Sequence, residues 1–115
     1  MVVLYGIKNC DTVKKARSWL DNQGIEYRFH DFRVDGLAIE KLQQFAAGLG
    51  WNAMLNRSST SWRQLSAEQQ SDLDEAKALQ LMLAIPTLIK RPILDTGSEL
   101  MIGFKPDLYH SKLNE

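Results

Sequence analysis

The first 30 residues carry a strand pattern, a helix pattern and a second strand pattern in direct succession. Residues 2–5 are apolar, as expected for a buried central strand. From Cys10 onward, apolar residues recur at helical spacing, and Gly24 is placed to end that helix. Residues 25–30 then alternate between apolar and polar side chains, which is typical of a half-exposed strand. A strand–helix–strand unit of this length predicts two parallel strands joined by a right-handed crossover.

The middle of the sequence is predominantly helical. Residues 42–49 place apolar side chains at positions i, i+3, i+4 and i+7. Ser66 and Gln69 match a capping box at the start of a helix. Another helix is expected over residues 74–84, whereas residues 51–57 are expected to form a loop.

The last third returns to strand patterns. Residues 93–94 and 100–102 are short apolar runs separated by a polar segment, which indicates a hairpin. A final helix is expected after Pro106, with an apolar side made of Leu108, Tyr109 and Leu113.

This order of elements predicts an α/β protein. Without its helical middle, the chain reads as βαβ followed by ββα, which fits one mixed four-stranded sheet with flanking helices. This is the thioredoxin-like arrangement. We therefore expect a single thioredoxin-like domain over residues 1–115, with an all-helical insertion at about residues 35–85.

Charge and targeting signals exclude several classes of protein. The 14 basic and 14 acidic side chains cancel to a formal net charge of zero, which argues against nucleic-acid binding. The N-terminus has no basic region before its short apolar run, so no signal peptide is predicted. No apolar stretch reaches the roughly 20 residues of a membrane span. We expect a cytoplasmic monomer that binds neither nucleic acid nor membrane.

Cys10 is the one cysteine, and it stands where the first predicted helix begins. Unpaired N–H groups and the helix dipole stabilise a thiolate at such a position, which favours a reactive thiol over a small packed cysteine. Val13 stands where a dithiol motif has its second cysteine, so an external thiol must resolve any mixed disulfide. His30 and His110 are isolated, and no metal site is predicted.

Several cations could accompany this thiol. Lys8, Arg57 and Lys105 are candidates, although a charge of this kind is more often a solvated surface group than a ligand group. Arg91 directly precedes Pro92 at the start of a predicted strand. In thioredoxin-like proteins a cis-proline precedes the third strand and faces the active thiol. We therefore expect a cis bond at Pro92, with Arg91 projected towards the thiol.

Four blocks of sequence resemble the arsenate reductase family, the ArsC, Spx and YffB group of the thioredoxin superfamily. The resemblance spans essentially the whole chain and is greatest to the YffB branch, whose active-site loop reads N-C-D-T. The blocks are Asn9-Cys10-Asp11-Thr12, Lys15-Ala16-Arg17-Ser18-Trp19-Leu20, Leu55-Asn56-Arg57-Ser58 and Lys90-Arg91-Pro92-Ile93.

The resemblance implies roles for individual residues. Cys10 matches the nucleophilic cysteine of the arsenate reductases. Arg57 and Arg91 match two arginines around the bound oxyanion, and Arg91-Pro92 matches an Arg–cis-Pro step. Lys105 stands where those enzymes carry a third arginine, so a point charge replaces a bidentate donor.

The chain also departs from the family pattern. Gly6 and Lys8 stand where the arsenate reductases have histidine and proline, which weakens the case for arsenate reduction. Val13 replaces the second cysteine of the Spx redox switch, which disfavours a disulfide-switched regulator.

Three hypotheses follow. The leading one is a glutathione-dependent monothiol oxidoreductase with no bound cofactor, in which glutathione is a co-substrate and reduces a mixed disulfide formed at Cys10. The cations, with backbone N–H groups near Asn9, Asp11 and Thr12, would bind the anionic substrate. The second is arsenate reduction with glutathione and glutaredoxin. The third is an Spx-like module that docks on RNA polymerase without catalysis.

Overall fold

The structure is a computed structural model, and it describes residues 1–113. Its contacts divide the chain into two compact units. The first unit joins Met1–Gly36 to the chain from Arg91 onward, and the second unit is Leu37–Lys90. The insertion expected at about residues 35–85 thus overlaps a helical unit with contacts of its own.

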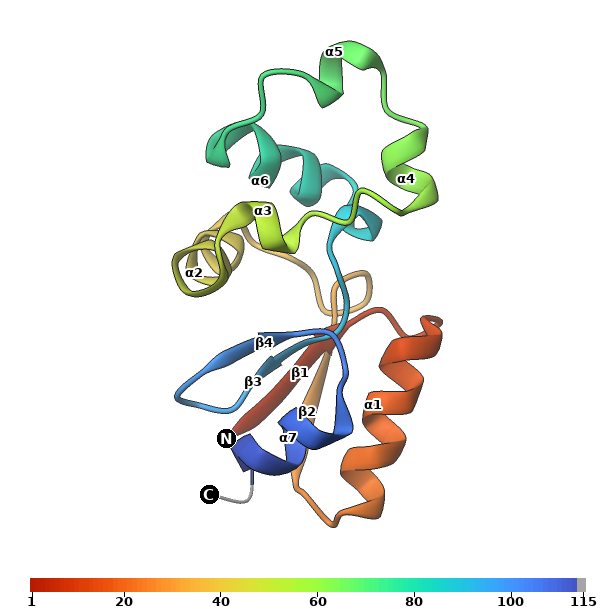
Figure 1. Ribbon diagram of the computed structural model, residues 1–115, viewed down its shortest axis with the longest axis vertical. Helices are drawn as coiled ribbons and strands as arrows, with labels where there is room; N and C mark the ends of the chain where they lie inside the picture. The colour runs from red at the N-terminus through yellow and green to blue at the C-terminus, as the bar shows by residue number, and fades with distance from the viewer. Residues whose placement is uncertain (114–115) are drawn as a thin grey trace. The chain divides into compact units, whose positions relative to one another are not determined.

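The first unit contains the mixed sheet (Figure 1). Strand order is β2-β1-β3-β4; β1 and β2 are parallel, and the two other pairs are antiparallel. The thioredoxin-like fold is confirmed. The elements are β1 (Val2–Gly6), α1 (Asp11–Asn22), β2 (Tyr27–Asp31), β3 (Ile93–Asp95), β4 (Leu100–Ile102) and α7 (Pro106–Leu113).

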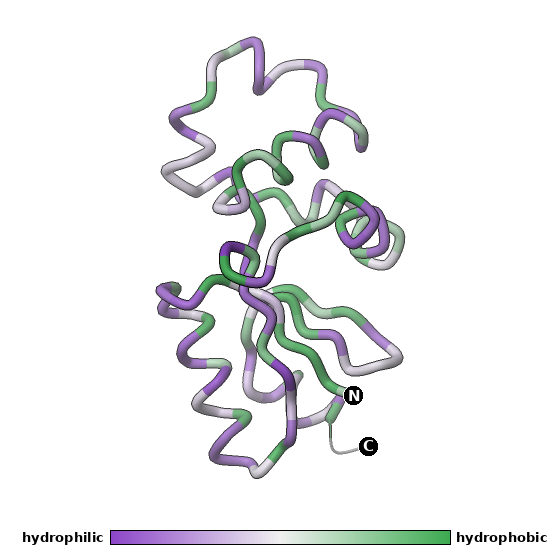
Figure 2. The backbone as a smooth tube through the Cα atoms, turned by 180° about the vertical axis from the view of Figure 1, so that it is seen from behind, coloured by the Kyte–Doolittle hydropathy of each residue, from purple (hydrophilic) through white to green (hydrophobic). Residues whose placement is uncertain are grey.

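One face of this sheet carries the core of the first unit. Leu4 of β1 and Leu94 of β3 are cross-strand partners, so their side chains share a face. Ala16 and Leu20 of α1 and Tyr109 of α7 pack on them, and all five residues are fully buried. Figure 2 shows β1 as a hydrophobic segment and α1 as a largely hydrophilic one, because α1 buries only one stripe.

The ends of α1 follow the sequence signals. Cys10 is the N-cap, and the helix ends at Asn22 before Gly24, whose φ of 69° is in the left-handed region. At α7 one prediction is wrong: Leu108 is 47% exposed, whereas Tyr109 is fully buried. Successive helical residues point about 100° apart, so the side that buries Tyr109 turns Leu108 to solvent.

Gly6, the last residue of β1, lies against α1. A Cβ placed on Gly6 would come within 2.7 Å of a Val13 methyl carbon. We expect Gly6→Ala to lower the free energy of unfolding by about 1–3 kcal/mol, because the core is overpacked there. Val13→Ala in the same chain should relieve the clash. Urea denaturation of the four variants should give a coupling free energy of about 1 kcal/mol or more, and additive effects would contradict the steric explanation.

The second unit is helical. Asp74 caps α6, and Ser66 and Gln69 form the predicted capping box at α5. The loop predicted over residues 51–57 is partly wrong, because α3 begins there directly after Gly50, which has a φ of 83° and ends α2. The elements are α2 (Ile39–Leu49), α3 (Trp51–Met54), α4 (Thr60–Arg63), α5 (Ala67–Gln70), α6 (Glu75–Ala84) and the 3-10 turn η1 (Pro86–Leu88).

Backbone hydrogen bonds join the segment at the end of α3 to the last residues of this unit. The N–H of Asn56 donates to Leu88 O over 2.8 Å, and that of Lys90 donates to Met54 O over 2.7 Å. They flank a bridge between Leu55 and Ile89. Within residues 1–113, no helix is long and apolar enough to cross a membrane.

Candidate active site

Cys10 occupies the N-cap of α1. Its φ and ψ of −98° and 126° are extended, and its C=O accepts the first helical hydrogen bond from Lys14 N–H over 2.9 Å. Its own N–H donates to Ile7 O over 3.2 Å, but its side chain makes no capping hydrogen bond. The residue is half-buried. The thiol therefore stands at the helix start, as predicted, and is not consumed by a structural contact there.

The first turn of α1 presents unpaired donors beside this thiol. In the part of the chain that the structure describes, no acceptor is bonded to the N–H groups of Asp11, Thr12 or Val13. Such groups and the positive end of the helix dipole attract anions. The same positive end stabilises a thiolate. Asp11 is itself an acid in this turn, which adds one negative charge near the donors.

The strand register brings other predicted residues to the same end of the sheet. Tyr5 pairs with Ile93, so the Arg91-Pro92 step lies opposite the end of β1, from which residues 7–10 lead to the thiol. The Arg91-Pro92 bond is cis, as predicted. Pro92 is buried, and its C=O accepts a hydrogen bond from Gly103 N–H over 2.8 Å.

Of the predicted cations, two lie in segments at this end of the sheet and are exposed. Lys8 is in the loop before the thiol, and Lys105 follows β4 by three residues. Asn9 is exposed in the same loop as Lys8. Arg91 is half-buried, and its Nε is buried.

Arg57 belongs to the second unit, so its predicted approach to Cys10 stays a prediction. Within that unit its guanidinium carbon lies 5.5 Å from the centre of the Trp62 ring. A cation over an aromatic face at this distance is attracted to it. This contact gives Trp62 a part in holding Arg57.

Asp31, the last residue of β2, was not singled out by the sequence. It is 5% exposed, and its carboxylate accepts hydrogen bonds from the N–H groups of Lys8 (2.9 Å), Arg33 (2.7 Å) and Val34 (3.2 Å). Burial opposes ionisation of this carboxyl, but the hydrogen bonds from Arg33, Lys8 and Val34 outweigh it and lower the pKa of Asp31. Asp31 thus anchors the loop that carries the thiol.

The segment after Asp31 is fixed in turn. Asp31 N–H donates to an Asp35 carboxylate oxygen over 2.9 Å, and Asp35 N–H donates back to Asp31 O over 2.8 Å. His30 Nε2 lies 2.7 Å from Gly36 O, and the ring packs 5.1 Å from the Tyr5 ring. Across residues 1–113, no group of three or more His, Cys, Asp or Glu side chains could hold a metal ion.

Comparison with known proteins matches these features to one family. The ArsC family model covers residues 5–111. The chain belongs to the ArsC family. A solved structure named YffB protein is 51% identical, with a TM-score of 0.94, and the match covers 98% of this chain and 99% of that one.

Other proteins similar to this chain align over most of its length. An arsenate reductase (ArsC) related protein from Brucella melitensis is 46% identical with a TM-score of 0.78, over 99% of this chain and 95% of that one. The global transcriptional regulator Spx of Lactiplantibacillus plantarum is 28% identical, over 93% of this chain and 82% of its own length. The proteins similar to this chain thus include one named for arsenate reduction and one named for transcriptional regulation.

Proposed function

We propose that this ArsC-family chain is a monothiol oxidoreductase that reduces glutathione mixed disulfides through Cys10. The observation that carries the proposal is a lone, half-buried thiol at the N-cap of α1, beside three N–H groups that have no acceptor among residues 1–113. Such a site favours a thiolate and holds an anionic ligand next to it.

The reaction takes place in two exchange steps. The Cys10 thiolate attacks the glutathione sulfur of a mixed disulfide R–S–S–G; the Cys10–S–S–G bond forms, and RS⁻ leaves and takes a proton from water. A second glutathione, as its thiolate, attacks the glutathione sulfur of this adduct. Glutathione disulfide forms, and the Cys10 thiolate is released. The net reaction is R–S–S–G + GSH → RSH + GSSG, so the protein gains no electrons.

The charged residues have a positioning role in this proposal. Glutathione carries two carboxylates, which can pair with Arg91, Lys105 and Lys8 at the thiol end of the sheet, and with Arg57 if the second unit presents it there. The N–H groups of Asn9, Asp11 and Thr12 bind the remaining anionic oxygen atoms. Pro92 contributes the cis bond that sets the direction of the chain at β3.

A coupled assay tests this function. The substrate is the mixed disulfide of glutathione with 2-mercaptoethanol, and NADPH with glutathione reductase reports the glutathione disulfide formed. We expect a rate that saturates with the mixed disulfide and rises with glutathione concentration. Mass spectrometry of a glutathione-free reaction should show one glutathione on Cys10. Absence of both the adduct and the turnover would reject the proposal.

Arsenate is the second candidate substrate. The named arsenate reductase relative and the unpaired N–H groups at α1 both favour an oxyanion at this site. The same assay with arsenate, glutathione and glutaredoxin separates the two candidates. NADPH consumption that depends on arsenate would favour this candidate, whereas turnover of the mixed disulfide alone would favour the first.

A further inference from the structure

A groove separate from the thiol loop lies along α1 in the first unit. Its volume is about 410 Å³, which is within the roughly 300–1,000 Å³ of small ligand sites. One wall is formed by residues of α1. Four of them share a helix face at spacing i, i+3, i+4 and i+7, and Lys14 lies next to this face; the four are Lys15, Ser18, Trp19 and Asn22. The other wall is Phe104 and Pro106, between β4 and the start of α7.

The apolar end of the groove is preorganised. Trp19 and Phe104 both meet the buried ring of Tyr109 edge-on, with ring centres 5.8 Å and 4.9 Å away. Tyr109 O–H donates to Gly103 O over 2.8 Å, which fixes the turn before Phe104. Burial raises the pKa of Tyr109, so this phenol keeps its proton. An apolar side chain entering here meets rings already held in place, so little entropy is lost.

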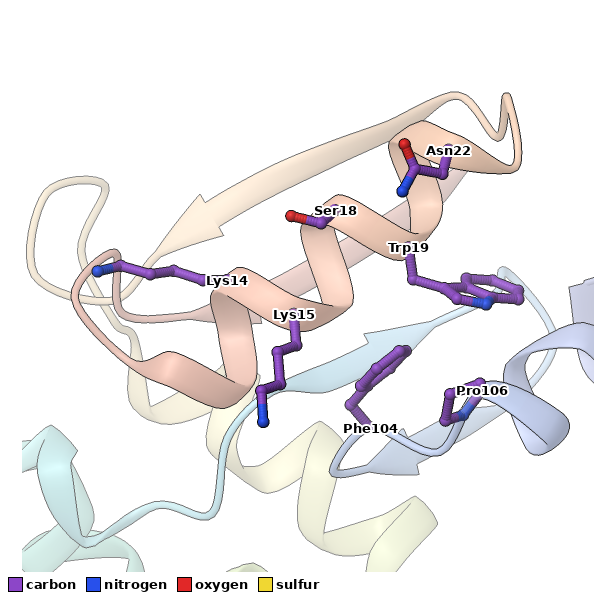
Figure 3. A pocket seen from close by; sticks show the side chains of 7 residues that line it. All are labelled: Lys14, Lys15, Ser18, Trp19, Asn22, Phe104 and Pro106. Atoms are coloured by element: carbon purple, nitrogen blue, oxygen red, sulfur yellow. The ribbon is translucent and has the colours of Figure 1, made fainter.

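The opposite end of the groove is positively charged. Figure 3 shows Trp19, Phe104 and Pro106 together at one end and Lys14 and Lys15 towards the other. Both lysines are exposed, and neither forms an ion pair or side-chain hydrogen bond within residues 1–113. The lining includes no acidic residue. The groove is therefore complementary to a ligand that combines negative charge with an apolar group.

We infer that this groove docks an acidic polypeptide segment of a partner protein, with one aromatic side chain packed against the exposed edges of Trp19 and Phe104, whose ring centres lie 6.3 Å apart, and with the segment's carboxylates beside Lys14 and Lys15. An extended strand of peptide rises about 3.3 Å per residue. Carboxylates one or two residues from the bound ring therefore reach along α1 to Lys15 and Lys14, four and five residues before Trp19. The chain's zero net charge favours a peptide over a nucleic acid, which needs a broader basic surface.

The test is a titration of the ¹⁵N-labelled chain, followed by NMR, with the peptide Ac-Glu-Asp-Phe-Asp-Glu-NH₂. We expect shifts of the Trp19 indole N–H and of the α1 backbone around Lys14 and Lys15. The same peptide with Ala in place of Phe, and Ac-Lys-Lys-Phe-Lys-Lys-NH₂, should each bind at least about fivefold more weakly. Raising the salt concentration should weaken binding of the acidic peptide.

Matched variants connect the effect to the groove. Lys14→Gln/Lys15→Gln should raise the Kd at least about fivefold, because two exposed charges are lost. Arg28→Gln/Lys41→Gln removes the same charge elsewhere and should leave the Kd unchanged. Phe104→Ala should abolish binding of the acidic peptide. If that variant does not fold, the Kd of the Lys14→Gln/Lys15→Gln variant tests the inference instead. The Cys10→Ser chain should bind as the wild type does, so this result is independent of the thiol chemistry.

Three results would overturn the inference. The first is equal affinity for the acidic and basic peptides. The second is an acidic peptide whose Kd is unaffected by the lysine substitutions. The third is a thymidine pentanucleotide that shifts the groove resonances at lower concentration than the acidic peptide does, which would assign the groove to single-stranded nucleic acid.

Discussion

Cys10→Ser is expected to lower turnover of the glutathione mixed disulfide by about 10³-fold or more, because loss of a covalent nucleophile removes the main route of reaction. A serine hydroxyl is essentially un-ionised at neutral pH and cannot replace the thiolate. The coupled assay measures the loss, and no glutathione adduct should be seen by mass spectrometry.

The same variant should be more stable than the wild type. The Cys10 side chain does not cap α1, whereas serine is among the preferred N-cap residues. We expect the free energy of unfolding to rise by about 0.5–1 kcal/mol, measured by urea denaturation. Loss of activity with a gain in stability shows that the thiol is kept for chemistry.

A control at the other end of α1 completes this experiment. Asp21→Asn changes an exposed residue outside both the thiol loop and the groove, and it should retain wild-type turnover. A Cys10→Ser chain that keeps more than a tenth of wild-type activity would contradict the nucleophile assignment.

Asp31→Ala is expected to have the largest effect on stability. Three N–H groups, of Lys8, Arg33 and Val34, lose their acceptor, and we expect a loss of about 2–4 kcal/mol. Turnover should fall about 100-fold in protein that remains folded, because the thiol loop loses its anchor and a misplacement of about 1 Å costs this much. The stability and the turnover of Asp31→Asn should lie between those of the wild type and of Asp31→Ala. Its single amide oxygen can accept either from Lys8 or from Arg33 and Val34, but not from both groups of donors.

The pH dependence of stability separates the charge of Asp31 from its packing. Its pKa is lower in the folded chain than the ordinary value of 3.8. The stabilisation is therefore fully present above the unfolded-state pKa and is lost as the pH falls through the lower folded-state value. The difference in unfolding free energy between wild type and Asp31→Asn should be constant above about pH 5 and shrink towards pH 3. A difference that does not change with pH would assign the effect to packing alone.

The local sequence pattern predicted the main helices and strands and the position of Cys10 at a helix start, because both depend on residues that are neighbours in sequence. The stripe on α1 and the position of Cys10 each lie within a few residues of the signal that predicts them, whereas the cis bond at Pro92 was predicted from the thioredoxin-like arrangement. Asp31 was missed because its partner Lys8 is 23 residues away and a lone acid at the end of a strand pattern is common. That position, directly after a predicted strand parallel to the one that leads to the thiol, is the signal that could have identified it.

Contacts between distant segments were beyond such patterns. Trp19 and Phe104 form their groove only because α1 and the segment after β4 cover the same face of the sheet. The helix α3 was predicted as a loop because a four-residue helix is too short to show periodicity. Arg57 was selected by resemblance to arsenate reductases, and its place relative to Cys10 depends on two units that fold around separate cores.

The close approach of Gly6 to Val13 bears on any redesign of the thiol loop. The resemblance to arsenate reductases implies histidine where this chain has Gly6, and a Cβ at that position would come within 2.7 Å of a Val13 methyl carbon. Introducing that histidine alone is therefore expected to cost stability by overpacking the contact with α1. A smaller residue at position 13 should lower that cost, so the loop and the helix that follows it have to be redesigned together.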